Sequence, residues 1–151
     1  MRTAMIYAAL AGIAWGVGGY FEKAGLRALG LPPLVGITVR TAVALAVLGT
    51  LSLPLWRALG ATRASPAGWA MVVLGGGVLA GSLGMWCFYA SLARTENLGA
   101  TLALAFALSP LAGTLLGLAR GTQPLDARGL AGLVAIVTGI VLLELSQRPG
   151  R

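Results

Sequence analysis

One charged residue stands inside a long apolar stretch of this chain. The segment PPLVGITVRTAVALAVLGTL, residues 32–51, contains Arg40 as its single charge. An arginine at the centre of a hydrocarbon layer costs about 3 kcal/mol or more, so such residues usually face a bundle interior or a water-filled cavity. The functional interpretation is that Arg40 forms the floor of a polar cavity and binds a carboxylate or phosphate. The alternative is an anchor whose long side chain extends to the membrane surface.

Three aromatic residues are predicted to lie at the depth of Arg40. Counting residues inward from the same membrane surface at 1.5 Å each places Trp15, Trp86 and Phe106 with Arg40, roughly 10 Å deep. A ring stacked on a guanidinium contributes about 0.5–2 kcal/mol. We therefore expect Trp15 and Trp86 to stack on Arg40.

Two further residues share helical stripes with these tryptophans. Glu22 lies seven residues after Trp15, and Tyr89 lies three after Trp86, so each pair falls on one helix face. Glu22 is the only acid near the proposed cavity. It is therefore the residue expected to neutralise Arg40.

Other chemistry has little support in the sequence. The chain has no histidine and a single cysteine, Cys87, which excludes a His/Cys metal site and an internal disulfide. Its four acids are scattered, and no nucleophile with a base and no phosphate-binding loop occurs. The net charge of +7 comes from basic residues that stand singly between apolar runs, unlike the clustered charges of a nucleic-acid-binding protein. We expect no catalytic residue, metal or cofactor, and no enzyme activity.

The composition is that of a membrane protein. Of 151 residues, 58% are apolar and 10% are charged, whereas about a quarter of the residues in a soluble domain are charged. A helix needs about 20 apolar residues to cross the membrane. The fold class predicted is an all-α polytopic membrane protein, a bundle of five transmembrane helices in a single domain, residues 1–151. The spans are expected at about residues 3–21, 34–55, 67–93, 97–119 and 128–146.

The alternative is four spans, if Arg40 blocks the second one. Helix limits are predicted by the break Gly30-Leu31-Pro32-Pro33 and by Ser65 and Asp126, which have the side chains and positions of N-caps.

The basic residues give no clear orientation. With five spans, each membrane surface receives five of them, and Arg40 is left inside the bilayer. Orientation follows the asymmetry of Lys and Arg in short loops. We therefore predict insertion in both orientations and an antiparallel homodimer. Two alternatives are a single orientation set by the N-terminal segment, and a second five-span homologue that supplies the inverted partner.

Two features of the fourth span concern helix packing and shape. Gly113 and Gly117 have the small-xxx-small spacing that lets membrane helices approach closely, which makes them the candidate dimer contact. Ser109-Pro110 lies near the middle of the span. Because Pro110 cannot donate a hydrogen bond to the carbonyl of Phe106, we expect a bend that either only shapes the helix or exposes backbone groups to a substrate.

Four segments carry a resemblance to a known family. AWGVGGYFEKAGL (14–26), PPLVGITVRTAVAL (32–45), GMWCFYASLARTENLGATLALAFALSPLAGTLLGL (84–118) and LAGLVAIVTGIVLLE (130–144) resemble one EamA-type half of the drug/metabolite transporter superfamily. Members are secondary transporters, often exporters, built from two inverted five-span halves. The resemblance implies a half unit with substrate-binding roles for Trp15, Gly16, Arg40, Tyr89, Ser109 and Pro110.

The function predicted is secondary transport, with export of small organic metabolites or amino acids by alternating access as an antiparallel dimer. Glu22 is the candidate residue for coupling transport to an ion. Its partners would be the bilayer of the inner or plasma membrane, the solute, and a second five-span chain. The alternatives are a non-transporting membrane subunit of a hetero-oligomer and a flippase for lipid-linked carriers.

Overall fold

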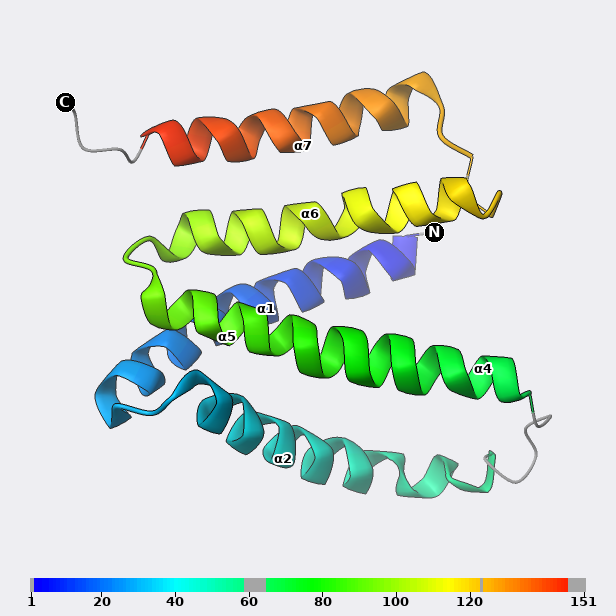
Figure 1. Ribbon diagram of the computed structural model, residues 1–151. Coiled ribbons are helices and arrows are strands. Elements are labelled where there is room, and N and C mark those ends of the chain that lie inside the picture. The colour runs from blue at the N-terminus through cyan, green and yellow to red at the C-terminus, as the bar shows by residue number, and fades with distance from the viewer. Residues whose placement is uncertain (1, 59–64, 123, 147–151) are drawn as a thin grey trace. The chain divides into compact units, whose positions relative to one another are not determined.

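The computed structural model describes residues 2–58, 65–122 and 124–146 (Figure 1). Within these ranges the chain is helical and contains no strand. The α-helices are α1 (Arg2–Leu29), α2 (Pro33–Ser52), α4 (Pro66–Ala70), α5 (Met85–Arg94), α6 (Leu98–Ala119) and α7 (Ala127–Ser146). A 3-10 turn, η1 (Leu53–Leu55), follows α2, and a π-helix, η2 (Met71–Gly84), joins α4 to α5.

Four helical segments are long and apolar enough to cross a membrane. They are Thr3–Leu29, Pro33–Leu55, Pro66–Arg94 and Leu98–Ala119, with 22 to 29 residues each. The predicted class, an all-α polytopic membrane protein, is confirmed. Arg40 does not interrupt α2, which runs through it as one helix. The apolar part of α7, Ala127–Leu143, is shorter than the other four, so a fifth span stays a prediction.

The end of α1 confirms the helix limit predicted at the Gly30–Pro33 break. The uncharged run ends at Phe21, but the helix continues through Glu22 and Lys23 to Leu29. It ends at Gly30, whose φ of 61° is a left-handed conformation that glycine adopts without steric strain. Gly30 and the residue after it donate backbone hydrogen bonds to the carbonyls of Arg27 and Leu26, the pattern of a Schellman motif. The same arrangement closes α6 at Gly121, with φ 64°.

Side-chain caps begin the later helices. The hydroxyl of Ser65 accepts the backbone N–H three residues on at 3.2 Å, and the carboxylate of Asp126 does the same at 2.7 Å. Both predicted caps are confirmed. Asn97 caps α6 in the same way at 3.0 Å, which the sequence analysis had not identified. Each cap satisfies an otherwise unpaired donor in the first helical turn.

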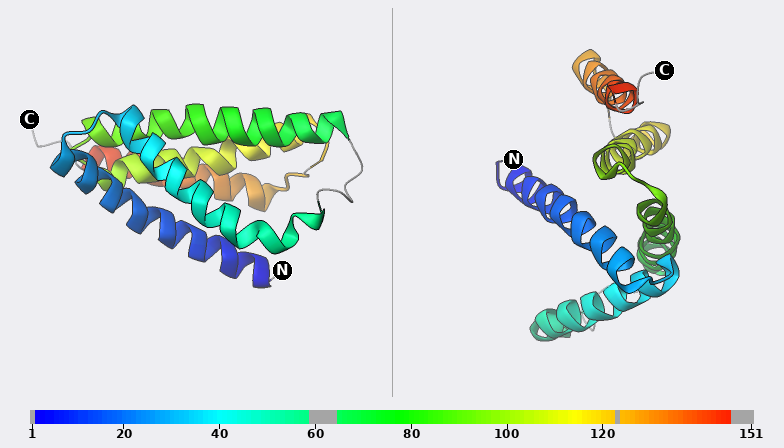
Figure 2. Two further views of the ribbon diagram at one scale, coloured as in Figure 1. Left: turned by 90° about the horizontal axis from the view of Figure 1, so that it is seen from below. Right: turned by 90° about the vertical axis from the view of Figure 1, so that its left-hand side faces the viewer.

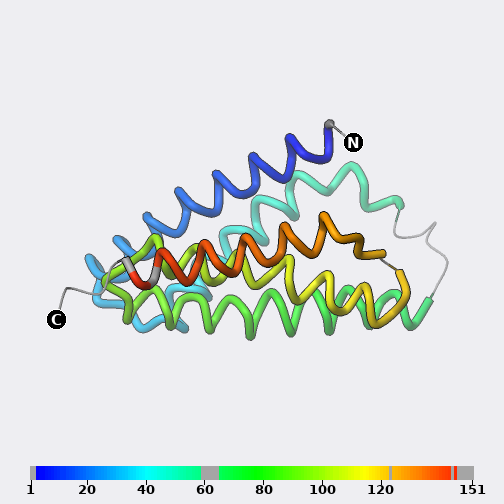
Figure 3. The backbone as a smooth tube through the Cα atoms, turned by 90° about the horizontal axis from the view of Figure 1, so that it is seen from above, coloured from blue at the N-terminus to red at the C-terminus, as the bar shows by residue number. Residues whose placement is uncertain are grey.

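The chain divides into two compact units. Unit 1 comprises Met1–Gly19 and Thr95–Arg151, and unit 2 comprises Tyr20–Arg94. In unit 1, α6 and α7 run antiparallel and pack side by side (Figures 1 and 3). In unit 2, α2 packs against α5 (Figure 2). The single domain expected from the sequence is not tested by this division and stays a prediction.

Few side chains are buried within the chain. The core cluster in unit 2 consists of Leu26, Ile37 and Tyr89, with partly buried apolar residues around it. By contrast, at most 6% of the residues in the most apolar window of each spanning segment are buried. Apolar surface on this scale requires lipid or another protein to cover it.

The segment η2 is a π-helix of 14 residues, Met71–Gly84. Such helices hydrogen-bond from i to i+5, and they are rare and usually only one turn long. Ser82 supports the wider spacing, because its hydroxyl donates to the carbonyl of Gly77, five residues back, at 3.0 Å. Gly81 permits it, because a Cβ there would lie only 3.0 Å from the carbonyl oxygen of Gly76.

Gly36 on α2 permits close packing against the core cluster. A Cβ at this position would overlap Leu26 Cδ2 and would lie 3.3 Å from Tyr89 Cε1. We expect Gly36→Ala to lower the free energy of unfolding by about 1–3 kcal/mol, because overpacking forces neighbouring side chains to shift. Denaturant unfolding of the purified protein in detergent measures the change.

Gly49→Ala is the matched control on the same helix. A Cβ at Gly49 has open space around it, and alanine favours a helix by about 1 kcal/mol over glycine. Equal stability of the two variants would contradict the packing assigned to Gly36.

Candidate functional site

Three polar side chains from three helices meet in unit 2. Arg40 Nε on α2 lies 2.8 Å from Glu22 Oε1 on α1. The hydroxyl of Tyr89 on α5 donates a second hydrogen bond to Glu22. The carboxylate is thus held by two donors from two different helices. The ion pair is the contact expected from the sequence, whereas the binding and coupling roles of these residues stay predictions.

The helices place this cluster near one end of each element. Arg40 lies seven residues after Pro33, about 10 Å along α2. Glu22 lies seven residues before Leu29, and Tyr89 lies five residues before the end of α5. All three positions are therefore one to two helical turns from the helix end nearest to them.

The three side chains differ in exposure. Tyr89 is 2% exposed and packs with Leu26 and Ile37 in the core cluster. The side chains of Glu22 and Arg40 are 18% and 38% exposed. The cluster thus has a buried hydroxyl at one side and a partly exposed guanidinium at the other.

The surroundings of the cluster are basic. Lys23 is buried beside Glu22 on α1, and Arg27 follows one turn later. At the end of α5, Arg94 donates to the carbonyl of Ala90 at 2.7 Å. The last part of α1 together with α2 and α5 therefore carries four basic residues and one acid. A positive field of this kind attracts anions.

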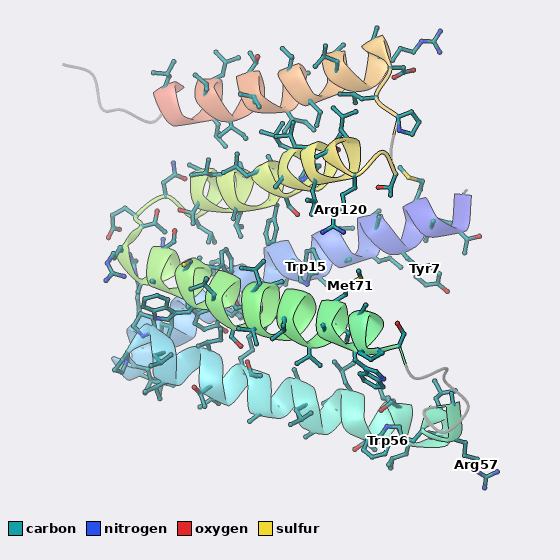
Figure 4. The ribbon with its side chains drawn as sticks, turned by 45° about the vertical axis from the view of Figure 1, so that its right-hand side comes forward. Tyr7, Trp15, Trp56, Arg57, Met71 and Arg120 are labelled. Carbon is teal, nitrogen blue, oxygen red and sulfur yellow. The ribbon has the colours of Figure 1, made fainter. Side chains whose placement is uncertain are left out.

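A pair of aromatic rings lies in unit 1. Trp15 on α1, labelled in Figure 4, stacks on Phe106 of α6 with ring centroids 5.6 Å apart and planes 12° from parallel. The rings are half-exposed, at 56% for Trp15 and 37% for Phe106. They form an offset-stacked pair, a favourable arrangement of two π-systems.

The remaining residues predicted for the solute site lie in the same two units. Trp86 is on α5, three residues before Tyr89, and is 46% exposed. Gly16 follows Trp15 on α1, and Ser109-Pro110 lies within α6, which continues as a helix past the proline. The structure thus groups Glu22 with Arg40 and Tyr89, and Trp15 with Phe106. The single cavity containing all of them, with Trp15 and Trp86 stacked on Arg40, stays a prediction.

The candidate dimer contact lies on α6. A Cβ at Gly113 would meet open space, so a neighbouring helix has room to approach there. The carbonyl of Gly117 accepts both the backbone N–H and the hydroxyl of Thr122 in the turn that closes the helix. The dimer itself stays a prediction.

Two features of the site were not found from the sequence. The bond from Tyr89 to Glu22 joins residues 67 positions apart, and no spacing rule connects them. Lys23 follows the uncharged run of the first span, which predicts a charge at the membrane surface, yet it is only 9% exposed. The feature of the sequence that could have indicated this burial is the position of Lys23 directly after Glu22.

The fold and the polar cluster together define a polytopic α-helical membrane protein. The sequence profile of the EamA-like transporter family matches residues 2–145. The chain belongs to that family, and the resemblance noted in the sequence is confirmed. Membership makes it a membrane transport protein of the drug/metabolite transporter superfamily. Searches of curated proteins and of solved structures gave no match.

The Glu22–Arg40 pair predicts a measurable coupling energy. Fully exposed ion pairs contribute up to about 1 kcal/mol, and breaking a buried pair costs about 3–5 kcal/mol. Because the Arg40 side chain is 38% exposed, we expect a coupling of about 1–2 kcal/mol between Glu22→Gln and Arg40→Gln. A double-mutant cycle of unfolding free energies measures it.

Arg57→Gln combined with Glu22→Gln is the control. Arg57 follows η1, past the end of α2 that is distant from Arg40 (Figure 4). Its effect should add to that of Glu22→Gln. Additive effects for the Arg40 pair as well would show that the ion pair does not stabilise the fold.

Proposed function

We propose that this chain is a secondary transporter that exports small organic metabolites or amino acids through the inner or plasma membrane. The observation that carries the proposal is the Glu22–Arg40–Tyr89 cluster in a member of a transporter family. Ionisable groups within membrane helices mark solute and ion pathways, because a purely structural helix avoids their desolvation cost.

The proposed solute site combines charge with aromatic surface. Arg40 binds an anionic group, and Glu22 is the coupling residue. Aromatic and small residues contact the rest of the solute, and the helix around Pro110 supplies backbone groups. The residues proposed for these contacts are Trp15, Gly16, Trp86, Tyr89, Phe106, Ser109 and Pro110.

The proposed mechanism is alternating access by two inverted copies. Many transporters hold the solute between two inverted repeats that rock against each other. The equal number of basic residues at the two membrane surfaces supports insertion both ways, and the exposed apolar helices supply surface for a partner. Three of the residues in this balance, Arg63, Arg148 and Arg151, lie outside the described part of the chain.

A second candidate function is that of a non-transporting subunit. It is favoured by the same exposed apolar surface, because a subunit that only packs beside a partner also needs large apolar faces. In a subunit of this kind, no solute needs to reach the guanidinium of Arg40. The two functions therefore differ in what happens when Arg40 is replaced.

Arg40→Ala should strongly reduce export. We expect cells that express the wild type to release one or more small organic solutes above the level of vector controls. Removing a charged partner of a bound anion costs at least about 2 kcal/mol, so Arg40→Ala should lower the rate more than tenfold. Mass spectrometry of the medium, with the membrane amount of each variant matched, measures the release.

Arg57→Ala is the control, since this arginine follows η1 and is not part of the cluster. Equal export by the two variants would make Arg40 an anchor only. No release by the wild type would favour the subunit.

Both orientations should be found in the membrane. We expect a fluorescent reporter that works only in the cytoplasm and a phosphatase that works only outside to be active when each is fused to the C-terminus. Thr122→Lys with Pro124→Lys adds two charges between α6 and α7, at the surface predicted to carry the N-terminus, and should shift the signal toward the phosphatase, because basic loops stay inside. Activity of one reporter alone in the unaltered chain would exclude dual insertion.

A further inference from the structure

Glu22 occupies the place on Arg40 that an anionic solute would need. Its Oε1 lies 2.8 Å from Arg40 Nε. A guanidinium binds any carboxylate through the same planar arrangement of donors, so a carboxylate on the solute is a direct competitor of Glu22. Binding of the solute at Arg40 therefore requires Glu22 to give up its partner.

A displaced Glu22 has an unfavourable environment as an anion. Its side chain is 18% exposed, and the second group that holds it is the buried hydroxyl of Tyr89. A carboxylate that loses its ion pair in such surroundings becomes protonated rather than remaining charged. Tyr89 accommodates both forms, because a hydroxyl donates to a carboxylate and accepts from a carboxylic acid.

The neighbouring charges favour joint binding of an anion and a proton. The other charged groups on the packed helices are Lys23 and Arg27 on α1 and Arg94 on α5, all of them basic. They oppose the addition of a proton alone and attract an anion. Adding both leaves the net charge of the cluster unchanged, which avoids the cost of a new uncompensated charge.

On the basis of the proposed transport function, we infer that the cluster binds an organic monocarboxylate together with one proton. The proton passes from water to a carboxylate oxygen of Glu22, and Arg40 stays protonated throughout. The ion pair between Glu22 and Arg40 is replaced by one between the solute and Arg40. Transport of a monoanion together with a proton is then electroneutral and does not respond to the membrane potential, and export runs down the solute's own concentration gradient.

Binding to the purified full-length chain in nanodiscs tests the inference. The probe is benzenesulfonate, a monoanion that stays ionised throughout the range, so any proton taken up goes to the protein. In the wild type the affinity measured from pH 8 down to pH 6 should rise, by up to tenfold for each pH unit, because one proton is linked to binding. Isothermal titration calorimetry in buffers of different ionisation enthalpy measures both the affinity and the proton uptake.

Single substitutions distinguish the role of Glu22 from that of Arg40. Glu22→Gln carries no titrating group, so it should bind the probe with an affinity that does not change with pH and exceeds that of the wild type at pH 8. Arg40→Gln should not bind. Glu96→Gln, which alters an acid outside the cluster, should behave as the wild type. If Glu22→Gln does not fold, Tyr89→Phe should reach a given affinity at a higher pH than the wild type, because the carboxylate has lost a donor.

Several results would overturn the inference. They are absence of binding in every protein, a wild-type affinity that does not change with pH, and pH-dependent binding in Glu22→Gln. Tighter binding of phenyl phosphate than of benzoate would exclude the monocarboxylate class. Counterflow of radiolabelled benzoate in proteoliposomes distinguishes the two proposals. Proton-linked binding without counterflow would refute only the proposed transport function. Counterflow without proton linkage would refute only this inference.

Discussion

The ion pair between Glu22 and Arg40 is the interaction on which the organisation of unit 2 depends. An isolated arginine in α2 would be costly in hydrocarbon, but a carboxylate from α1 and a hydroxyl from α5 convert it into a hydrogen-bonded network. This network joins three helices near one end. The close approach at Gly36 and the burial of Tyr89 follow from the same convergence, because helices linked by short polar contacts must also pack closely there.

The membrane imposes a second constraint, the pairing of backbone groups at helix ends. No water is present in the hydrocarbon to replace a missing partner, so chain reversals belong at the surfaces. The described reversals fit this requirement. Two helices end in Schellman motifs at glycines with positive φ, and three begin at a Ser, Asn or Asp that caps the first turn. Such short, saturated turns keep antiparallel neighbours such as α6 and α7 together.

Local properties of the sequence were predicted better than contacts between helices. Hydropathy and cap chemistry act within about one helical turn, so the spanning segments and the caps at Ser65 and Asp126 followed from the sequence. The break at Gly30–Pro33 likewise predicted where α1 ends and α2 begins. Counting residues predicts that Trp15 and Phe106 lie at the same depth. Their stacking on each other depends on helix rotation, which no count specifies.

The position of the cluster near one helix end has a consequence for the proposed inverted dimer. Arg40 lies about 10 Å from the start of α2, on the side where α1 turns into α2. An inverted second copy would carry the same cluster near the opposite membrane surface. Each side of the bilayer would then present one guanidinium and one carboxylate to an arriving solute. Two chemically identical half-sites, exposed alternately, would provide alternating access without any difference in sequence between the two copies.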